Sequence, residues 1–570
     1  MSYIDVATTK DEVVCWYRDE ETNELKTKRE PIGEYCFLYI KDNTGNATHY
    51  NIYGDPLRKL SFDDKYQMKQ YIDSHDEVFE SDVPIGTKYL IENFRDCKAD
   101  APVNIMYFDI EVDFDLNEGR GYPRPDNPYG EINAISCYDV SQGMYIMFIP
   151  SHCEGIVFLE DERDGIPVET IFCDSESQML RLFSSYLEEY EIDIITAWNG
   201  DGFDIPYMVE RACILFGMDK GKSFMCRDGF SAKRRDFIND YGEEVWEWKL
   251  VGRHHIDMMK LFKKFQPGEK KSFALDNICR EELGENKIDY TGDLGELYRT
   301  DPQSFFDYSL HDSRLLKYLD DKKKAISLAM LMSRDSCALP TDIFGSVKVI
   351  ENGLMKFCRN KGNIVLDDKS VNEKERFEGA IVYDTVPGRH VNVFSIDLAS
   401  LYPSVMMMLG LSKETMIAQC TRGYEDYIRV MTNSDEEVVV EWTQNKETQN
   451  MIASDLLKEI KERGWTISAN GTIFTGEDGI LSSFVREGFD QRKEYKKLMT
   501  QAETEEERQR YDLYQSVRKI RNNSVYGISG EPSFRMYDIR LAESITLTGQ
   551  IISKWQAQKA NELIDRVMGR

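Results

Sequence analysis

Residues 394–404, FSIDLASLYPS, decide the fold of the second half of the chain. The apolar start of this stretch predicts a buried strand with Asp397 at its exposed end. Ser400, Tyr402 and Pro403 then predict a turn into a helix. A carboxylate at such a position can hold a divalent cation. The stretch therefore predicts a strand, a turn and a helix arranged around Asp397.

Two pairs of polar side chains follow later in the chain. Arg492 and Lys496 are four residues apart, as are Lys519 and Asn523, so each pair lies on one face of a helix. Side chains that bind anions, placed opposite an acid that binds a metal, are typical of a nucleoside triphosphate site. The rear half of the sequence therefore predicts such a site.

These segments resemble the sequence motifs of the B-family DNA polymerases, and in particular the replicative polymerases of T-even-type bacteriophages. The matching stretches are SIDLASLYPS (395–404, motif A), RKIRNNSVYG (518–527, motif B), DQRKEYKK (490–497, fingers helix) and NIYGDPLRKL (51–60). The resemblance covers essentially the whole chain in order. The family's motif C, a YGDTDS turn that carries the second catalytic aspartate, is expected soon after residue 570, where the sequence ends.

The composition is that of a folded protein. The chain has 570 residues, 41% of them hydrophobic and 12% aromatic, and at ~150 residues per domain this length predicts about four domains. No leader or membrane-spanning run is present in the sequence, so we expect no membrane association and a cytoplasmic location, in a phage-infected bacterial cell. The 12 cysteines lack zinc-ligand or redox spacing and are expected to be reduced and buried.

The formal net charge of −30 argues against a protein that coats DNA non-specifically, because such binding depends on neutralising phosphates. Any DNA track must come from local basic patches. The stretch YQSVRKIRNN (514–523) contains no acid and is one such patch.

Three segments of the front half carry acids. NIMYFDIEVDFD (104–115) predicts a strand from which Asp109 and Glu111 project to the same side. ITAWNGDGFDIPY (195–207) predicts a strand that runs into a loop ending at Asp204. FFDYSLHDSRLLKYL (305–319) predicts an amphipathic helix with Tyr308 and Asp312 one turn apart. Carboxylate oxygens suit Mg²⁺, or Mn²⁺ in its place.

In order, these segments resemble the three exonuclease motifs of the family, DxE, Nx3FD and Yx3D. The resemblance implies an RNase H-like 3′-5′ proofreading domain in which Asp109, Glu111, Asp204 and Asp312 hold two metals and Tyr308 orients the attacking water. In a chain with 101 Asp and Glu residues, any one of these pairs is more often a solvated surface pair. Their joint occurrence in order favours the site.

For the polymerase half, the resemblance implies that Asp397 coordinates both catalytic metals, with the main chain of Leu398 beside it. The main-chain NH groups of residues 398–402, including those of Ser400 and Leu401, would bind the triphosphate at the start of the helix. The Tyr402 ring would exclude a 2′-hydroxyl, the group that separates ribonucleotides from deoxyribonucleotides. The alternative is that the residues LYPS only shape a turn.

Residues 477–531 predict two long antiparallel helices, the fingers of the family. By resemblance, Arg492, Lys496 and Lys519 grip the phosphates, Asn523 lies beside them, and Tyr526 lies near the nascent base pair. The alternative is a charged, solvent-exposed hairpin of helices. The repeated basic face on both helices favours the site.

The predicted fold class is α/β, a multi-domain α+β protein. Its expected segments are an N-terminal mixed domain (1–103), the exonuclease domain (104–324), a linking segment (325–368), a first part of the palm with motif A (369–476), the fingers with motif B (477–531) and a second part of the palm (532–570).

Smaller features carry their own expectations. Residues 242–260 alternate like a hairpin, which could separate strands or form an ordinary sheet edge. His254 and His255 are expected to be structural. FEGAIV (377–382) resembles the family's YxGG/A motif, with Phe377 in place of the usual tyrosine. In the helix over residues 551–567, we expect Ile552, Trp555 and Leu563 on the inner side.

The leading hypothesis is the N-terminal half of a split phage replicative polymerase that uses Mg²⁺, primer-template DNA and dNTPs. A second polypeptide would supply motif C and the thumb, and through it the sliding clamp. An exposed apolar edge is expected where that polypeptide docks. One alternative is a stand-alone 3′-5′ exonuclease with a non-catalytic, DNA-binding palm. Another is a binding module or a truncation product.

Overall fold

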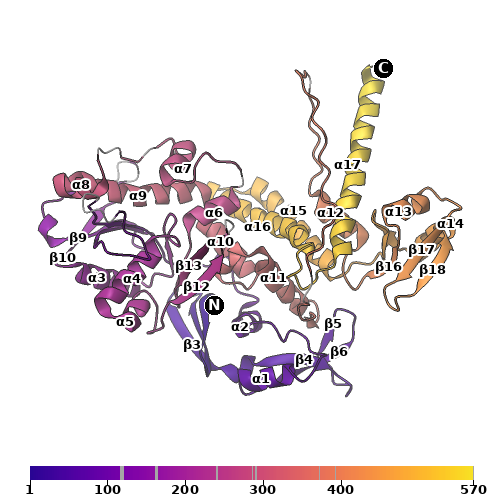
Figure 1. The fold of residues 1–570 in the computed structure, drawn as a ribbon, viewed down its shortest axis with the longest axis horizontal. Helices are drawn as coiled ribbons and strands as arrows, with labels where there is room; N and C mark the ends of the chain where they lie inside the picture. Colours follow the sequence, from indigo (N-terminus) through magenta and orange to yellow (C-terminus); the bar gives the residue numbers. More distant parts are fainter. Residues whose placement is uncertain are drawn as a thin grey trace. The chain divides into compact units, whose positions relative to one another are not determined.

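The computed structural model describes residues 1–115, 121–160, 163, 165–238, 242–266, 268–285, 287–288, 292–370, 373–391 and 393–568. These residues divide into two compact units, each built from two separate stretches of the chain. Unit 1 comprises Met1–Ile32 with Ile85–Phe344, and unit 2 comprises Gly33–Pro84 with Gly345–Arg570. Helices and strands occur in both units (Figure 1), which confirms the predicted α/β multi-domain class. The six predicted segments stay a prediction.

Unit 1 begins with an antiparallel sheet of three strands, β1 (Ser2–Thr8), β2 (Glu12–Arg18) and β3 (Leu25–Pro31). Val14 and Trp16 of β2 are fully buried in the main apolar core of the unit. Helix α2 (Ile85–Phe94) packs on β1, where the rings of Tyr3 and Phe94 meet edge to face at 5.5 Å. This small sheet thus extends the core of the unit.

The second sheet of unit 1 has six strands in the order β10-β9-β8-β7-β11-β14. The bounds of these strands are β7 Ile105–Val112, β8 Ile132–Asp139, β9 Met144–Pro150, β10 Val168–Cys173, β11 Ile194–Thr196 and β14 His254–His255. Neighbours among β7, β8 and β9 are antiparallel, whereas β10, β11 and β14 each run parallel to their partners. Strand β7 therefore lies inside the sheet.

Helices cover this sheet, and the alternation of β7 assigns a face to each of its side chains. The helices of the unit that follow are α3 (Glu176–Glu189), α4 (Asp204–Phe216), α5 (Met218–Ser223), α6 (Met258–Phe265), α7 (Leu275–Glu282), α8 (Leu294–Thr300), α9 (Pro302–Lys323) and α10 (Ala325–Asp335). Phe108 of β7 and Phe148 of β9 both pack on Phe183 of α3. Because adjacent strand residues point to opposite faces, Asp109 points away from α3, and α9 packs on β7 and β8.

The predicted hairpin over residues 242–260 is wrong in its bounds. The observed hairpin pairs β12 (Lys233–Ile238) with β13 (Glu244–Lys249). Residues 254–255 instead join the main sheet as β14, and α6 follows. The apolar alternation continues across both the hairpin and the next sheet strand, so periodicity alone could not separate them. Trp248 of β13 is buried, as expected for one of the two tryptophans.

Unit 2 contains a four-stranded sheet in the order β15-β5-β6-β4. Its strands are β4 (Phe37–Lys41), β5 (His49–Asn51), β6 (Pro56–Ser61) and β15 (Ile364–Val365), accompanied by helices α1 (Lys65–Ile72) and α11 (Ser346–Asn360). Strand β15 comes from the predicted linking segment and pairs with β5 of the N-terminal stretch. Arg535 also joins the two stretches, because it donates hydrogen bonds of 2.8 and 3.0 Å to the two carboxylate oxygens of Asp82.

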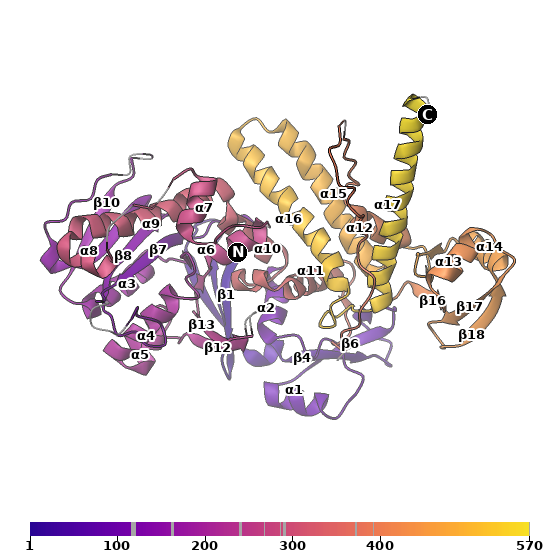
Figure 2. The same ribbon diagram turned by 45° about the horizontal axis from the view of Figure 1, so that its top comes forward.

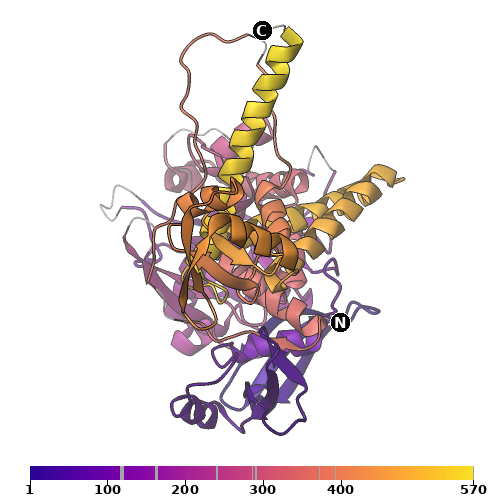
Figure 3. The same ribbon diagram turned by 90° about the vertical axis from the view of Figure 1, so that its right-hand side faces the viewer.

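A second sheet of unit 2 has five strands in the order β18-β17-β16-β20-β19. Its elements are β16 (Met416–Cys420), α13 (Tyr424–Met431), β17 (Glu437–Trp442), β18 (Thr448–Ile452), α14 (Ala453–Arg463), β19 (Thr466–Ile467) and β20 (Thr472–Phe474). Val438 and Val440 pack with Leu456 of α14 in one apolar core. Figure 3 shows the two helices lying over this sheet.

Four helices complete unit 2, namely α12 (Leu401–Leu409), α15 (Ile480–Gln501), α16 (Glu505–Ser529) and α17 (Ile539–Met568). Helices α15 and α16 pack side by side along their length (Figure 2). Arg518 donates a 2.5 Å hydrogen bond to Gln491 across this pair, and the rings of Tyr495 and Tyr514 lie 5.0 Å apart. The predicted antiparallel helical hairpin is confirmed.

The predicted buried strand at residues 394–397 is wrong. Residues 393–398 form no strand, and Phe394 is 78% exposed. The same run exposes Val382, Val386, Val393 and Ile396. An apolar run becomes a strand only when it finds partner strands, and no described residue pairs with it. These apolar side chains are exposed, but they do not form the edge of a sheet, so the expected apolar edge stays a prediction.

The expectation for the last helix also needs correction. Trp555 and Leu563 of α17 are 60% and 58% exposed, so they are not covered within unit 2 as described, while Ile552 is half-buried. Thr546 and Gln550, earlier in the helix, instead hold the segment that follows Phe377. Thr546 donates to the Glu378 carbonyl at 2.7 Å, and Gln550 to the Gly379 carbonyl at 2.8 Å.

Two expectations about the whole chain remain. All 12 cysteines are free, and every one except the half-buried Cys97 is buried, as predicted. Among the described helices, none combines the length and apolar character required to cross a membrane.

Candidate active sites

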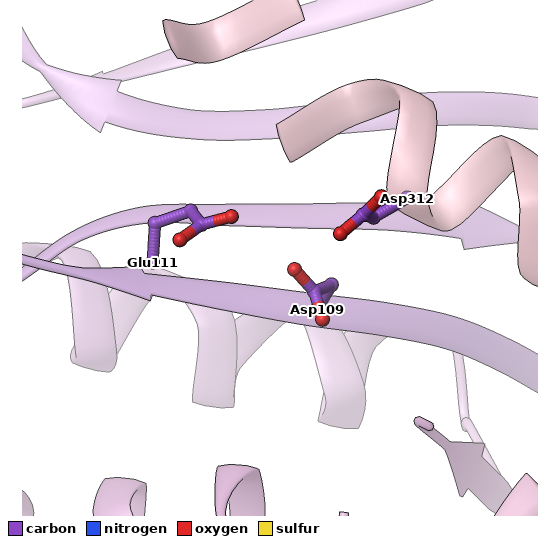
Figure 4. Close-up of side chains that lie close together, drawn as sticks. All are labelled: Asp109, Glu111 and Asp312. Carbon is purple, nitrogen blue, oxygen red and sulfur yellow. The ribbon is translucent and has the colours of Figure 1, made fainter. Parts of the chain in front are cut away.

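Three carboxylates gather on one face of the main sheet of unit 1. Asp109 and Glu111 project from β7 toward Asp312 on α9, and the three point at one another (Figure 4). One ligand oxygen from each can be chosen so that all three lie within 4.8 Å of one another. This is the only such group of three or more possible metal ligands in the described part of the chain. The sequence predicted all three residues.

Buried hydrogen bonds fix α9 against the sheet beside these acids. Ser136 lies directly opposite Asp109 in the β7–β8 register. Its hydroxyl donates to the Ser309 carbonyl at 2.8 Å, and the Ser313 hydroxyl donates to the Ser136 carbonyl at 3.0 Å. Because Ser313 follows Asp312, these bonds set where the Asp312 carboxylate lies.

A second buried bond joins the same two elements. The Tyr107 hydroxyl donates to the Asp320 carboxylate at 2.6 Å. Tyr107 lies two residues before Asp109 on β7, and Asp320 lies two turns after Asp312 on α9. The strand and the helix are thus tied on both sides of the acids.

Asp204 enters from a third element. It begins helix α4, directly after a loop in which Asn199 has a left-handed backbone, with φ of 63°. Its side chain is buried. Asp204 lies outside the three-residue group, but it is among the like charges that raise the pKa of Asp109. The structure thus brings all four predicted acids into one electrostatic neighbourhood.

The acids have raised pKa values because they are withdrawn from water and close to one another. Burial, with Asp312 as the next cause, raises the pKa of Glu111 to about 8. Burial raises the pKa of Asp204 to about 7. The pKa of Asp109 lies well above its ordinary value through burial and the charges of Asp312, Asp204 and Glu111. Four such carboxyls are not ionised together at neutral pH without a compensating positive charge.

One compensating charge is Lys287, which the sequence gave no reason to select. Its ammonium forms an ion pair with Asp312 and donates a 2.9 Å hydrogen bond to the Tyr308 hydroxyl. Burial alone would lower the pKa of Lys287, but Asp312, Tyr308 and Asp109 raise it. Lys287 therefore connects the predicted tyrosine to the predicted acid.

The donor set fits hard divalent cations. All the ligand atoms are carboxylate oxygens, which Mg²⁺ and Mn²⁺ prefer. The Oδ1 atom of Asp312 is buried and has no hydrogen-bond partner among the described residues. A buried carboxylate oxygen without a donor is a position that a cation satisfies.

A second constellation lies in unit 2, where the start of α12 meets α15 and α16. The Arg492 guanidinium of α15 donates a 3.2 Å hydrogen bond to the Ser400 hydroxyl, at the turn before α12. The rings of Tyr402 on α12 and Tyr526 on α16 have centroids 4.2 Å apart. Three elements predicted to share a site are thus in contact.

Most of the remaining predicted residues of this site face solvent. Asp397, Lys496, Lys519 and Asn523 are exposed, whereas Leu398 and Leu401 are half-buried. Ser400 has a left-handed backbone with φ of 56°, and it ends the extended segment directly before α12. Asp397 therefore lies on open surface at the start of a helix.

Two sequence models of known families match the chain. Residues 344–566 match the sequence model described as DNA polymerase family B. Residues 41–278 match the one described as DNA polymerase family B, exonuclease domain. The chain belongs to DNA polymerase family B. It carries both the polymerase and the exonuclease parts of that family, as the sequence motifs predicted.

Relatives of this family align over most or all of the chain. The DNA-directed DNA polymerase of Escherichia phage RB69 is 25% identical over all of this chain and 67% of its own length. The DNA-directed DNA polymerase of Enterobacteria phage T4 is 26% identical, with the same coverage. The DNA polymerase delta catalytic subunit of Drosophila melanogaster is 26% identical over 79% of this chain and 39% of its own length. The family B assignment therefore spans phage and animal relatives.

Proposed function

We propose that unit 1 removes nucleotides from the 3′ end of DNA by metal-assisted hydrolysis. The observation that carries this proposal is the group formed by Asp109, Glu111 and Asp312, with ligand oxygens within 4.8 Å of one another. Asp204 would complete the set, and the four acids would hold two Mg²⁺ ions, with Mn²⁺ as a substitute. Two such ions, ~3.5–4 Å apart in known sites, supply an activated water and stabilise the departing 3′ oxygen.

The other side chains have positioning roles in this proposal. The Tyr308 hydroxyl orients the attacking water, and the Lys287 ammonium fixes that hydroxyl through its 2.9 Å hydrogen bond. Lys287 also pairs with Asp312, so it offsets part of the negative charge of the acids before the metals and the DNA bind.

The test is digestion of single-stranded DNA labelled at its 3′ end, in the presence of Mg²⁺. We expect label release from the unmodified chain and none from Asp109→Ala. Asp321→Asn is a matched control, because this acid of α9 is 53% exposed and pairs only with lysines of its own neighbourhood. Absence of digestion by the unmodified chain, or full digestion by Asp109→Ala, contradicts the proposal.

We further propose that unit 2 binds primer-template DNA and a dNTP for template-directed nucleotide addition. The contacts between Arg492 and Ser400 and between Tyr402 and Tyr526 support it. Asp397, with the Leu398 main chain, would bind the metals. The NH groups around Ser400 and Leu401 would bind the triphosphate together with Arg492, Lys496, Lys519 and Asn523.

The proposed reaction needs a second carboxylate, because two metals must be held between the primer end and the α-phosphate. We propose that a second polypeptide supplies it in motif C, together with the thumb and the contact to a sliding clamp. The exposed apolar run over residues 382–396 and the exposed Trp555 and Leu563 of α17 offer a docking surface for it. By analogy with the phage relatives, the place of action would be the cytoplasm of an infected bacterial cell.

A primer-extension assay of this chain, with and without a polypeptide carrying motif C and the thumb, tests this proposal. Extension only in the mixture is the expected result. A second candidate is a stand-alone 3′-5′ exonuclease with a DNA-binding palm, and the contrast between the clustered acids of unit 1 and the exposed Asp397 favours it. It predicts digestion but no extension in either sample, whereas extension by the chain alone contradicts the need for a second polypeptide.

A further inference from the structure

The loop that carries Asp204 is built around tight backbone contacts. The NH groups of Gly202 and Phe203 both donate to the Asn199 carbonyl, at 2.9 and 3.1 Å. A Cβ atom at Gly200 would clash with the imidazole of His255, so only glycine lets the backbone approach this ring. The ring of His255 therefore packs against the backbone of the loop at Gly200.

Asp201 fastens this loop to a neighbouring strand and helix. One oxygen of its carboxylate accepts a 2.8 Å hydrogen bond from Nδ1 of His255, and the other accepts a 2.5 Å bond from the Lys260 ammonium. Its main-chain NH donates to the Asp257 carboxylate at 3.2 Å. Asp201 thus makes polar contacts to His255 of β14, Lys260 of α6 and Asp257, the residue that caps α6.

Strand β14, which carries His255, is hydrogen-bonded to the main sheet of unit 1. Strand β14 pairs in parallel with β11, and the pair continues with the Ile256 NH donating to the Ile195 carbonyl at 3.0 Å. The Met258 NH donates to the Ala197 carbonyl, also at 3.0 Å. The loop between β11 and α4 therefore packs against residues that are hydrogen-bonded to β11 itself.

The groups that bind the Asp201 carboxylate also affect its pKa. Burial alone would raise the pKa of Asp201, but His255 and Lys260 lower it, so Asp201 stays ionised. His255 also acts to lower the pKa of Asp204, which burial raises. The side chain of His255 is only 2% exposed. The imidazole is therefore buried against the Asp201 carboxylate and against the backbone of the loop that leads to Asp204.

We propose that Asp201 and His255 are a positioning pair that places Asp204 to bind metal in the exonuclease site. This inference rests on the exonuclease function proposed above. Asp204 is the first residue of α4, directly after a loop, whereas Asp109 and Glu111 lie within a strand and Asp312 lies within a helix. The position of Asp204 therefore depends on how that loop is held. Loss of the pair would let the start of α4 shift without removing any ligand.

The experiment compares two variants of nearly equal chemistry. His255→Asn keeps an amide donor at the place of Nδ1, whereas His255→Gln moves that donor to the place of Nε2. Asp201→Ala removes the acceptor. His254→Gln is the matched control, because the neighbouring histidine of β14 contacts the Ile4 carbonyl at 2.9 Å through Nε2 and so keeps its donor.

The first readout is Mn²⁺ binding to the DNA-free protein, followed by electron paramagnetic resonance. All variants carry Asp397→Ala, and the signal that Asp109→Ala removes defines the exonuclease site. We expect Asp201→Ala and His255→Gln to weaken this binding by roughly 10–100-fold, the usual effect of losing the supports around metal ligands. His255→Asn and His254→Gln should bind Mn²⁺ like the parent chain.

The second readout is 3′ digestion, with thermal unfolding measured on every variant. Digestion should fall in parallel with Mn²⁺ affinity, by about 10²-fold for a misplacement near 1 Å. Equal Mn²⁺ affinity of His255→Asn and His255→Gln, or unchanged affinity in folded Asp201→Ala, overturns the pairing. If the parent chain digests no DNA, the exonuclease proposal fails. The Mn²⁺ affinities of the variants still decide whether Asp201 and His255 position Asp204.

Discussion

The guanidinium of Arg492 on α15 donates a 3.2 Å hydrogen bond to the hydroxyl of Ser400, three residues after Asp397. This bond brings a permanent cation of α15 to the start of α12. The start of a helix presents free NH groups and the positive end of its dipole. Two independent features that favour anions therefore converge on one turn.

Replacing Arg492 by alanine should weaken dNTP binding. Charge-assisted hydrogen bonds contribute about 1.5–3 kcal/mol each, so the KM for dNTP should rise by roughly 10–100-fold. Steady-state primer extension in the presence of the proposed second polypeptide measures this effect. Arg486→Ala is the control, because Arg486 of the same helix is occupied by Asp478 at 2.8 Å. An unchanged KM in Arg492→Ala refutes the assignment.

Replacing Tyr402 by valine should relax the choice of sugar. The centroid of the Tyr402 ring lies 4.2 Å from that of Tyr526, and this packing supports the proposed position of the ring beside the sugar. Losing such a steric contact changes discrimination by roughly 10–200-fold. The ratio of ribonucleotide to deoxyribonucleotide incorporation measures it. Tyr526→Phe keeps both rings and should leave the ratio near that of the parent chain. An unaltered ratio in Tyr402→Val rules out the proposed exclusion of a 2′-hydroxyl by Tyr402.

Replacing Lys287 by methionine should destabilise the metal-free protein most at alkaline pH. Lys287 is the ion-pair partner of the buried Asp312, and removing one partner of a buried pair costs up to about 3–5 kcal/mol. The cost should be smaller at acidic than at alkaline pH, because burial raises the pKa of Asp312 and a protonated Asp312 no longer requires a cationic partner. Denaturant unfolding at the two pH values measures the difference. Equal losses at both pH values contradict this account, and Lys270→Met, at a pair away from the acids, should show no such dependence.

The metal-free protein should lose stability as the pH rises from about 5 to 8. Glu111 and Asp204 have folded pKa values of about 8 and about 7, above the ~4 of unfolded carboxyls. The folded state therefore binds more protons across this window, and its advantage is lost as the pH passes the folded pKa values. Thermal unfolding in a chelator measures the slope. Glu111→Gln should flatten it, and Mg²⁺ should oppose it, since metal binding favours the ionised acids.

Sequence periodicity located the acids of unit 1 because each depends on local structure. Asp109 and Glu111 follow the two-residue repeat of a strand, and Tyr308 and Asp312 follow the turn of a helix. Their order along the chain then matched known motifs. Lys287 has no such signal, because it lies in an irregular stretch and reaches Asp312 only through the tertiary fold.

The sequence predictions that were wrong also share a physical origin. Phe394 and Ile396 belong to an apolar run that reads as a strand, yet a strand needs partners that are distant in sequence. The hairpin bounds failed for the same reason, since His254 and His255 continue the alternation of β13 but pair with β11. The proposed support of Asp204 by Asp201 has no signal in the sequence, because His254 and His255 were both expected to be structural.

The exposed apolar run of unit 2 yields the last prediction. Val393 and Phe394 are 75% and 78% exposed, an arrangement that costs solubility unless another surface covers it. A polypeptide that binds only the folded chain stabilises it by about 2.7 kcal/mol at a concentration of 100 Kd. Mixing the chain with the polypeptide that carries motif C should therefore raise its Tm and reduce its aggregation.

Phe394→Asp should abolish that rise without lowering the Tm of the lone chain, because the Phe394 side chain is largely exposed there. Ile428→Asp is the matched control, since Ile428 is also exposed, at 39%, but lies on α13 away from this run. Differential scanning calorimetry of each chain with and without the partner gives the comparison. Equal Tm values for the unmodified chain in both samples would show that the run does not bind this partner, whereas a loss of the rise in Ile428→Asp would place the contact on the five-stranded sheet instead.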